Sequence, residues 1–594
     1  MRTERRGRRE WAPVPVSTET DQGRGGSAAS SHPPELSGQS QFIEKPRTDW
    51  VVFGTTAAIM FILVAWGALS TNSLKAFADA ALDWLVLNIG WGFVLAATGF
   101  VIFALFLAFS RYGRIPLGED GEKPEFRTVS WIAMMFSAGM GIGLMFYGVS
   151  EPLSHFTEPP PGTVAPESDP AVNTAMATSL FHWTLHPWAI YAVVGLAIAY
   201  SSFRRGRKQL ISAVFLPLIG KRNAEGPLGR LIDILALFAT LFGSAASLGL
   251  GTLQIQAGMQ AAGWIGATSK ILLVGIIVVL TICFILSAVS GVAKGIQWLS
   301  NINMVLAALL AIFVFVVGPT VLILNLLPTS LGAYISDFGD MASRAGATGG
   351  GEMHEWLSTW TIFYWAWWIS WTPFVGMFIA RISRGRTIRQ FIGGVMLVPS
   401  VVSLVWFAIF GGAAIGSQQA GQNPAGSGEA EAQTFSVLEN MPLSVITSVL
   451  VMVLVAIFFV SGADAASVVM GTLSQRGSIE PSRWVVIFWG AATGAVAAIM
   501  LVIGGNNALE GIQNLTFMGA LPFAIVMVFL CVALTKDLRS DPITLRDEKG
   551  AEVLEQAVIA GTEEHEGDFQ LVTTPAEDEG EESGDAGNSE KNGS

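Results

Sequence analysis

The stretch WLSTWTIFYWAWWISWTPF, residues 356–374, decides the fold and the class of this protein. It places six tryptophans within sixteen residues and is apolar enough to lie in a bilayer. Trp365, Trp368 and Trp371 recur every three residues, so a helix would align them along one stripe. The face of an indole ring attracts a cation that cannot donate hydrogen bonds. The stretch therefore predicts a membrane helix that presents tryptophans to a quaternary ammonium or a similar solute.

A second aromatic segment, FHWTLHPWAIY at residues 181–191, supplies two more tryptophans and a tyrosine. Tryptophans also gather at membrane–water interfaces, which gives a simpler explanation for some of these residues. That explanation suits Trp356 and Trp360, which lie near the end of an apolar run. It does not suit Trp368, which lies a dozen positions inside the run.

The composition places the chain among membrane proteins. Of its 594 residues, 51% are hydrophobic and only 13% are charged, whereas a soluble protein has about twice that charged fraction. The net charge of −12 lies in tails and loops and gives no indication of a nucleic-acid partner. Cys283 and Cys531 both lie in apolar runs, so we expect neither a disulfide nor a cysteine metal site.

Twelve apolar runs are long enough to span a bilayer. They are residues 50–71, 84–110, 130–150, 179–203, 232–260, 270–292, 297–325, 356–380, 389–416, 441–462, 482–504 and 513–535. We therefore expect an all-α polytopic membrane protein with twelve transmembrane helices within residues 49–537. The polar residues 1–48 predict a disordered cytoplasmic tail. Residues 538–594 predict an acidic, mostly disordered cytoplasmic tail, in which 545–558 could form a short helix.

Basic residues alternate between successive loops and set the expected orientation. The loops rich in lysine and arginine are 111–128, 204–231 and 381–389. The loops that contain neither residue are 151–178, 417–440 and 505–512. This alternation predicts a multi-pass protein of the cell membrane with both termini in the cytoplasm. The arginines of the first ten residues could contact anionic membrane lipid or serve only as an anchor.

The stretch SLGAYISDFGDMASRAG, residues 330–346, is too short and too polar to span a bilayer. It alternates apolar and charged positions. Two interpretations stay open: an amphipathic helix along the outer surface and an ordinary extracellular loop.

Two of the expected spans contain helix-breaking residues. The third has Gly139, Gly141 and Gly143 at alternate positions, and the eighth has Pro373. Irregular backbone at membrane depth lines a cavity or is buried in protein. The two spans are five apart, which is the pattern of a transporter built from inverted repeats with a site at the bilayer midplane. The alternative is that the glycines only allow close packing of helices.

Four segments carry a resemblance to a known family. They are AGMGIGLMFYG (138–148), FHWTLHPWAIYAVVGLAIAY (181–200), KGIQWLSNINMVLA (294–307) and TIFYWAWWISWTPFVGMFIARISRGR (361–386). Over about residues 48–540 the chain resembles the betaine/choline/carnitine transporter family, and within it the sodium-coupled glycine betaine symporters. The resemblance implies a homotrimer with a LeuT-like fold, in which two leading helices precede inverted five-helix repeats at about 130–325 and 356–535.

The resemblance also implies a function. It indicates sodium-coupled uptake of a zwitterionic compatible solute for osmoprotection, with glycine betaine first and ectoine, proline or carnitine as alternatives. A sodium-independent substrate/product antiporter of the carnitine type is the competing function. Neither function is enzymatic, and neither needs a cofactor beyond sodium as the coupling ion.

The site residues follow from the same resemblance. The aromatic box for the ammonium group maps onto Trp183, Trp188, Tyr191 and Trp368. The backbone that approaches the substrate carboxylate maps onto Gly139, Met140, Gly141 and Gly143. The path toward the cytoplasm maps onto Trp367, Trp371 and Phe374. Arg381 and Asp464 lie at span ends on the same, cytoplasmic side, so two interpretations stay open: an ion pair that latches a gate, or solvated charges at helix ends. Relatives that move cationic choline have Asp where this chain has Gly143, so a zwitterion is expected here.

Sodium requires oxygen ligands. One expected site uses Ser461 with the carbonyls of Ser137, Met140 and Phe458, and a second uses Thr240 and Ser244. The family pattern has two adjacent hydroxyl residues where this chain has Ser461 and Gly462, so one hydroxyl ligand is missing. The competing interpretation is that these hydroxyls only bond the backbone one turn back.

His182 and His186 are four residues apart, which is the spacing of two metal ligands on one helix. No third ligand is evident beside them, so we expect a structural or hydrogen-bonding role instead of a metal enzyme. Glu151 is expected at the end of the third span, outside the site.

Overall fold

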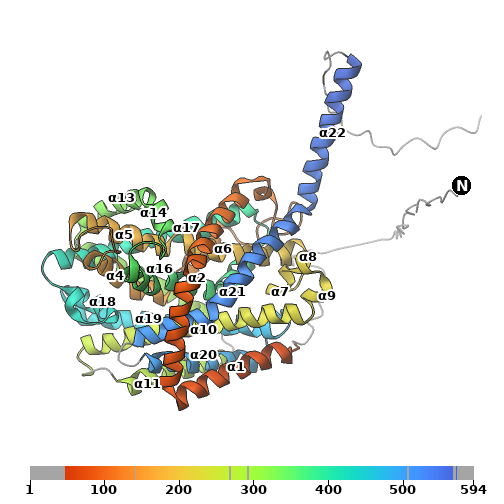
Figure 1. Ribbon diagram of the computed structural model, residues 1–594. Coiled ribbons are helices and arrows are strands. Elements are labelled where there is room, and N and C mark those ends of the chain that lie inside the picture. The colour runs from red at the N-terminus through yellow and green to blue at the C-terminus, as the bar shows by residue number, and fades with distance from the viewer. Residues whose placement is uncertain are drawn as a thin grey trace, which may run out of the picture. The chain divides into compact units, whose positions relative to one another are not determined.

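The computed structural model describes residues 47–565 apart from 140, 267–268, 291–292 and 505–507, together with residue 570. Within these residues the chain folds into helices without a named β-strand (Figure 1). A single isolated bridge pairs Pro116 with Thr387. The expected all-α membrane fold is confirmed.

Helices occupy all twelve of the apolar runs found in the sequence. They are α1 Trp50–Leu69, α2 Thr71–Phe109, α3 Thr128–Gly139 with α4 Ile142–Thr157, α5 Asp169–Trp183 with α6 Leu185–Ala199, α10 Pro227–Ala261, α11 Lys270–Ser290, α12 Ala293–Val317, α16 Thr361–Arg381, α17 Ile388–Gln419, α19 Ser444–Ser474, α20 Arg483–Ile503 and α21 Ala508–Arg539. The remaining helices are η1 Arg111–Arg114, η2 Tyr200–Arg204, α7 Ile211–Val214, α8 Leu216–Ile219, α9 Lys221–Ala224, α13 Thr320–Ser336, α14 Phe338–Ser343, α15 Gly350–Thr359, η3 Pro424–Ser427, α18 Ala430–Glu439 and α22 Pro542–His565.

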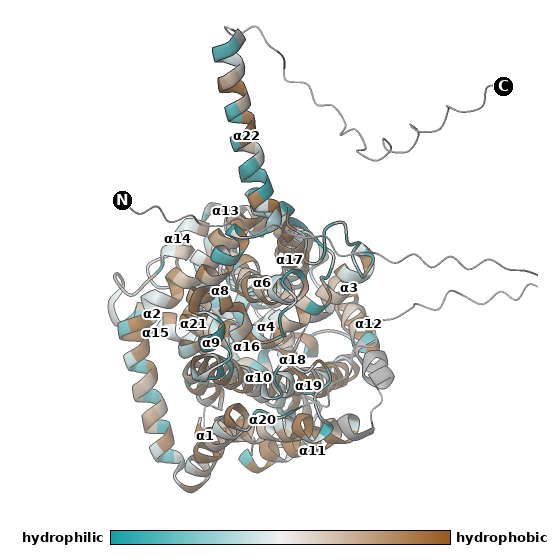
Figure 2. Ribbon diagram, turned by 90° about the vertical axis from the view of Figure 1, so that its right-hand side faces the viewer, coloured by the Kyte–Doolittle hydropathy of each residue, from teal (hydrophilic) through white to brown (hydrophobic). Residues whose placement is uncertain are grey.

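Nine helices of the described chain are long and apolar enough to cross a bilayer on their own. The bent pair of residues 301–317 and 320–336 makes a tenth candidate. The two other expected spans fall short, because α3 and α4 are each too short and the indoles of α16 lower its hydropathy. Hydrophobic residues dominate α1, α11 and α20 (Figure 2). The exact number of twelve therefore stays a prediction.

The expected break in the third span is confirmed. Helix α3 ends at Gly139 and α4 begins at Ile142, and Gly141 between them is extended with φ −163°. Side chains from two neighbouring helices donate hydrogen bonds to carbonyls in the first turn of α4. Trp406 of α17 donates to the Leu144 carbonyl at 2.9 Å, and Gln254 of α10 donates to the Met145 carbonyl at 2.8 Å. The unwound end is thus held in place by side-chain hydrogen bonds.

The expected break at Pro373 is wrong. Helix α16 is continuous from Thr361 to Arg381, and the chain breaks before it, at Trp360 with φ −115° and ψ −88°. Proline removes one backbone donor, and packed neighbouring helices tolerate that loss in membrane spans. Here α16 packs against α6, α10 and α21. The Thr372 hydroxyl also donates to the Trp368 carbonyl at 2.7 Å.

The fourth span contains a break that the sequence did not indicate to us. Thr184 has φ −113° and ψ −110°, and it separates α5 from α6. Pro187, the third residue of α6, is the available signal, because proline favours the first turn of a helix. This break lies between Trp183 and Trp188, so it sets how the two indoles are placed relative to each other.

The seventh expected span ends earlier than predicted. Helix α12 stops at Val317, Gly318 and Pro319 intervene, and α13 leaves at an angle of 108°. Residues 330–336 end α13 and 338–343 form α14, whereas 344–346 are not helical, so the helical interpretation is correct for most of this stretch. Whether this helix lies along the outer membrane surface stays a prediction.

The C-terminal segment is more helical than predicted. Helix α22 spans Pro542–His565 and includes the short helix expected at 545–558. The N-terminal tail to residue 46 and residues 571–594 lie outside the described residues. The extent of both expected disordered tails therefore stays a prediction.

Candidate functional site

A cavity lies among α4, α5, α6, α16 and α17, which lie together in the upper left of Figure 1. It holds about 460 Å³ of empty space, including its open side. Its lining consists of Gly141, Gly143, Leu144, Trp183, Pro187, Trp188, Tyr191, Trp367, Trp368, Trp371 and Ser403. The four residues expected to form the aromatic box all line this one cavity.

The rings of the box are set at steep angles to one another. Trp183 and Trp368 lie 4.9 Å apart between centroids with planes at 77°, and Tyr191 lies 6.2 Å from Trp368 at 82°. Trp188 lies 5.4 Å from Tyr191 at 80°. Trp367 is stacked on Trp368 at 4.6 Å. Rings at such angles can turn their faces toward one space from different directions, and the face is the part of a ring that attracts a cation.

Gly143 is required by the box itself. A Cβ atom at this position would lie 2.7 Å from Cη2 of both Trp183 and Trp367. Any side chain here would force at least one indole to move. At Gly141, by contrast, a Cβ atom would meet nothing within 4 Å.

The first turn of α4 supplies the polar wall of the cavity. Gly141, Gly143 and Leu144 line it, and the first backbone N–H groups of a helix have no intrahelical partner. A helix N-terminus favours an anion through these groups and through the helix dipole. Gly139 ends α3. Met140 lies outside the described residues, and so does the side chain of Ser137.

The indole N–H groups bind protein acceptors behind the rings. Trp368 donates to the His182 carbonyl at 3.1 Å, Trp367 to the Ser247 hydroxyl at 3.2 Å and Trp371 to the Gly243 carbonyl at 2.7 Å. Phe374 contacts Trp371 with 5.7 Å between centroids. The rings are therefore fixed in orientation before any solute arrives.

Four of the six expected sodium ligands lie on α10 and α19, which pack against each other, while Ser137 lies on α3 and Met140 is outside the described residues. The Thr240 hydroxyl donates to the Ala236 carbonyl at 2.9 Å. The Ser461 hydroxyl lies 2.8 Å from the Ile457 carbonyl and 3.3 Å from the Phe458 carbonyl. A hydroxyl that donates to the backbone still has lone pairs for an ion. With Ser244, buried on α10, these residues stay predicted ligands.

The expected gate pair is apart in this conformation. Arg381 donates to the Gln209 side chain at 3.0 Å and to the Thr472 hydroxyl at 3.4 Å. Within the described part of the chain, no ion pair joins Arg381 to Asp464. Their pairing in another conformation stays a prediction.

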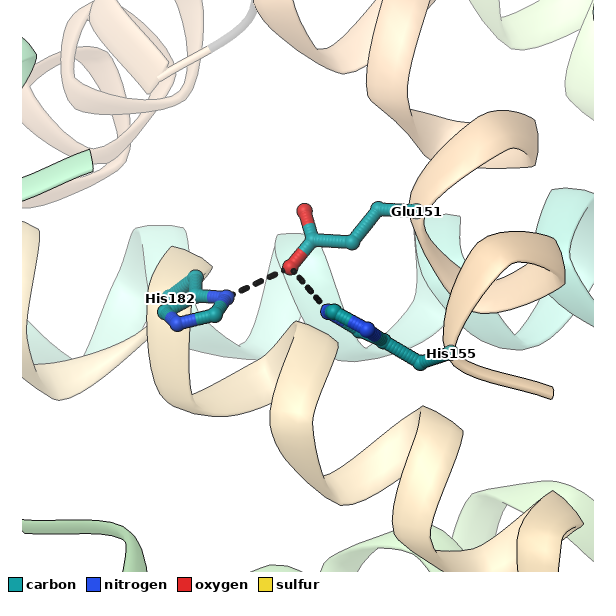
Figure 3. A group of neighbouring side chains, drawn as sticks. All are labelled: Glu151, His155 and His182. Atoms are coloured by element: carbon teal, nitrogen blue, oxygen red, sulfur yellow. Dashed lines mark hydrogen bonds and ion pairs between the residues drawn. The ribbon is translucent and has the colours of Figure 1, made fainter. Parts of the chain in front are cut away.

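Sequence reasoning placed Glu151 outside the site, but the structure buries this carboxyl group directly behind the box (Figure 3). One oxygen, Oε1, lies 2.6 Å from His182 Nδ1 and 3.6 Å from His155 Nε2. The other, Oε2, accepts hydrogen bonds from Trp183 Nε1 at 2.6 Å and from the Tyr364 hydroxyl. A glutamate within an otherwise uncharged span, four residues before His155, was the available signal.

His182 therefore pairs with Glu151, whereas His186 does not join this group. The ring of His186 is stacked on Trp365 at 4.9 Å, and its Nε2 lies 3.3 Å from the Thr98 hydroxyl. The expectation of structural and hydrogen-bonding histidines agrees with these contacts.

The atoms of Glu151, His155 and His182 that could bind a metal lie within 4.8 Å of one another. Two ligands of a tetrahedral metal at about 2.0 Å are roughly 3.3 Å apart. The 2.6 Å between Glu151 and His182 is instead the length of a hydrogen bond. The geometry is that of a hydrogen-bonded pair, Glu151 and His182, with the His155 ring nitrogen 3.6 Å from the same oxygen.

The apolar helices and the preformed aromatic cavity among them have the architecture of a solute transporter. The comparison of sequences defines the family: residues 51–543 match the betaine/carnitine/choline (BCCT) family of transporters. The chain belongs to this family.

Curated relatives cover most of the chain. A betaine/ectoine transporter of Corynebacterium glutamicum is 46% identical over 89% of this chain and 84% of its own length. A glycine betaine transporter of Bacillus subtilis is 45% identical over 85% and 96%. An ectoine/hydroxyectoine transporter of Virgibacillus pantothenticus is 39% identical over 82% and 96%. A solved manganese transporter of Eremococcus coleocola aligns with a TM-score of 0.38 and 12% identity over 72% of this chain and 82% of its own, a similarity too low to support an argument.

Proposed function

We propose that this chain imports a zwitterionic compatible solute, with glycine betaine as the first candidate, by symport with sodium. The observation that supports it best is the joining of two walls in one cavity: indole and phenol rings on one side and the first turn of α4 on the other. The names of the three relatives support betaine-type and ectoine-type solutes.

The two walls match the two ends of a zwitterion. The rings of Trp183, Tyr191 and Trp368 receive the ammonium group, at about 0.5–2 kcal/mol per ring. The N–H groups of the first turn of α4 receive the carboxylate. With Gly143 in place of an aspartate, the cavity wall itself carries no fixed negative charge, so a solute that brings its own carboxylate fits better than a bare cation.

Sodium coupling is proposed from the hydroxyl groups on α10 and α19 and from the resemblance to sodium symporters. Gly462 leaves one of the expected hydroxyl ligands missing. This departure favours the second candidate function, sodium-independent exchange of substrate and product. We further expect a homotrimer, and alternating exposure of the cavity as the two helical repeats rock against each other.

The decisive experiment is uptake of labelled glycine betaine, ectoine, proline and carnitine into proteoliposomes that contain the full-length chain. Each solute is tested with an inward sodium gradient, with equal sodium on both sides, and with potassium replacing sodium. We expect concentrative uptake of glycine betaine only with the inward gradient. Equal exchange without sodium would support the antiporter, and transport of none of the four solutes would refute the proposed substrate class.

A further inference from the structure

The carboxyl group of Glu151 joins three of the five helices that line the cavity: α4, α5 and α16. It lies on α4, fully buried, two turns beyond Gly143 and roughly 12 Å from it along the helix axis. Its Oε2 accepts from Trp183 on α5 and from Tyr364 on α16, while its Oε1 binds His182 on α5. Hydrogen bonds to a carboxyl group that is cut off from water are strong and directional.

Trp183 is held by α4 at both ends of its ring system. Its Cη2 edge lies so close to Gly143 that only glycine fits there, and its Nε1 donates to Glu151 at 2.6 Å. With both ends fixed, the indole plane cannot rotate without breaking the hydrogen bond or colliding with α4. Glu151 thereby determines which part of this ring the cavity presents.

Tyr364 links the same carboxyl group to Trp368, the ring on the other side of the box from Glu151. Its hydroxyl donates to Glu151, and its ring is stacked on Trp368 at 5.9 Å with 19° between planes. His182 adds a second link, since its Nε2 lies 3.0 Å from the Thr361 hydroxyl and its carbonyl accepts from Trp368 Nε1. Trp183 is thus bonded directly, and Trp368 through Tyr364 and His182, to one carboxyl group that does not line the cavity.

We propose that Glu151 is the positioning residue of the solute cavity, acting through Trp183 and Tyr364 to hold the rings at the angles that bind the ammonium group. This inference rests on the proposed function for the identity of the solute. The ring geometry that it concerns does not depend on which solute binds.

The test compares Glu151→Ala with Glu151→Gln in uptake by the full-length chain. Glutamine keeps an oxygen where Trp183 and Tyr364 donate, so we expect the KM to stay within about threefold of the parent. Alanine leaves both donors unpaired, and we expect the KM to rise at least tenfold, with a smaller change in Vmax per folded transporter. Asp233→Asn, a change at another buried acid on α10 that binds Ser212 instead of the cavity, is the matched control.

A double-mutant cycle with Tyr364→Phe separates positioning from a merely structural role. This variant removes only the hydroxyl, so its effect on KM should be absent once Glu151 is alanine. Additive effects would overturn the inference, as would an unchanged KM in Glu151→Ala. Equal damage by the glutamine and alanine variants would also overturn it, because charge instead of hydrogen bonding would then be responsible. If the purified parent bound one metal ion per chain and His155→Ala did not, Glu151, His155 and His182 would be metal ligands and the inference would be overturned.

A measurement without solute distinguishes failure of this inference from failure of the proposed function. Ser403 lines the cavity, and Ser403→Cys in a background free of Cys283 and Cys531 reports how far a thiol reagent can enter. We expect Glu151→Ala, but not Glu151→Gln, to change the labelling rate at least threefold. An unchanged rate would overturn the inference even if the chain transports no compatible solute.

Discussion

At the residue scale, the cavity depends on rings whose orientations are set by their hydrogen bonds. Trp368 shows this clearly: its ring is buried, its N–H binds the His182 carbonyl, and its plane is steeply inclined to those of Trp183 and Tyr191. Trp365 lies three residues away on the same helix but packs on Phe181 and His186 outside the cavity. The two tryptophans therefore provide a matched pair.

Trp368→Leu should weaken solute binding by roughly 2- to 30-fold, which corresponds to the loss of about 0.5–2 kcal/mol for one ring face. Trp365→Leu should leave the affinity unchanged, although it lowers stability by creating a cavity in the packed interior. Equilibrium binding of glycine betaine to the purified variants measures both effects. Equal affinities of the parent and Trp368→Leu would show that this ring does not contact the ammonium group.

Gly143 gives a second prediction at this scale. Gly143→Ala should raise the KM for uptake at least fivefold, because the new Cβ atom would lie 2.7 Å from two indole rings that must then move apart. Gly99→Ala on α2, where a Cβ atom would meet nothing, is the control. If both variants transport like the parent, the rings are not held as tightly as these contacts indicate.

At the element scale, the sequence predicted which segments are helical better than where the helices break. The alternating glycines located the break before α4, because glycine weakens a helix in any surroundings. The break predicted at Pro373 is wrong, because the effect of a proline on a helix depends on what packs around it, and α16 is enclosed by other helices. The Trp360 break has no comparable local signal, and the signal for the Thr184 break, Pro187, lies three residues after it. Glu151 was missed because its partners come from α5 and α16, and such contacts form only once those helices pack together.

Pro373→Ala tests the corrected description of α16. Since the helix is already continuous through this position, alanine only restores one backbone hydrogen bond. We expect uptake to stay within about twofold of the parent and the midpoint of thermal unfolding to be unchanged or slightly higher. Loss of transport would show that a bend at Pro373 is needed in another conformation.

At the scale of the whole molecule, charged groups tie the start of α22 to the loops between spans. Arg204 binds Asp120 and Asp541, while Glu548 of α22 pairs with Arg111. Asp541 is buried and Arg204 nearly so, whereas Arg111 and Glu548 are exposed. Exposed ion pairs contribute little and are screened by salt, whereas buried ones are screened much less.

Low pH should weaken the ion pairs of Arg204 with Asp120 and Asp541, which hold the start of α22 against the loops. Hydrogen bonds from Arg204 and Arg546 lower the pKa of Asp120. Burial alone would raise the pKa of Asp541, but hydrogen bonds from Arg204, the Ile543 amide and Tyr200 leave it below its ordinary value. A carboxyl group with a lowered pKa stabilises the folded state above its ordinary pKa near 3.9, and this stabilisation is lost as the pH falls through the lowered value. The contact should therefore persist from pH 7 to about pH 5 and weaken below about pH 4.

Spin labels on the 119–123 loop and on α22 can measure this separation as the pH is lowered. Asp541→Asn should reproduce the acid effect at neutral pH, and Glu548→Gln, at an exposed pair, should not. Separation that already increases at pH 6 would contradict the assignment to these two carboxyl groups.

The most direct test of the central claim is the affinity of the purified chain for three ligands of matched shape, followed through its tryptophan fluorescence. Glycine betaine offers both charges, its neutral-headed isostere 3,3-dimethylbutanoate keeps only the carboxylate, and choline keeps only the ammonium group. The rings and the α4 N-terminus together predict that glycine betaine binds at least tenfold more tightly than either of the others. Equal binding of the isostere would contradict cation recognition by the rings, and equal binding of choline would contradict recognition of the carboxylate by α4.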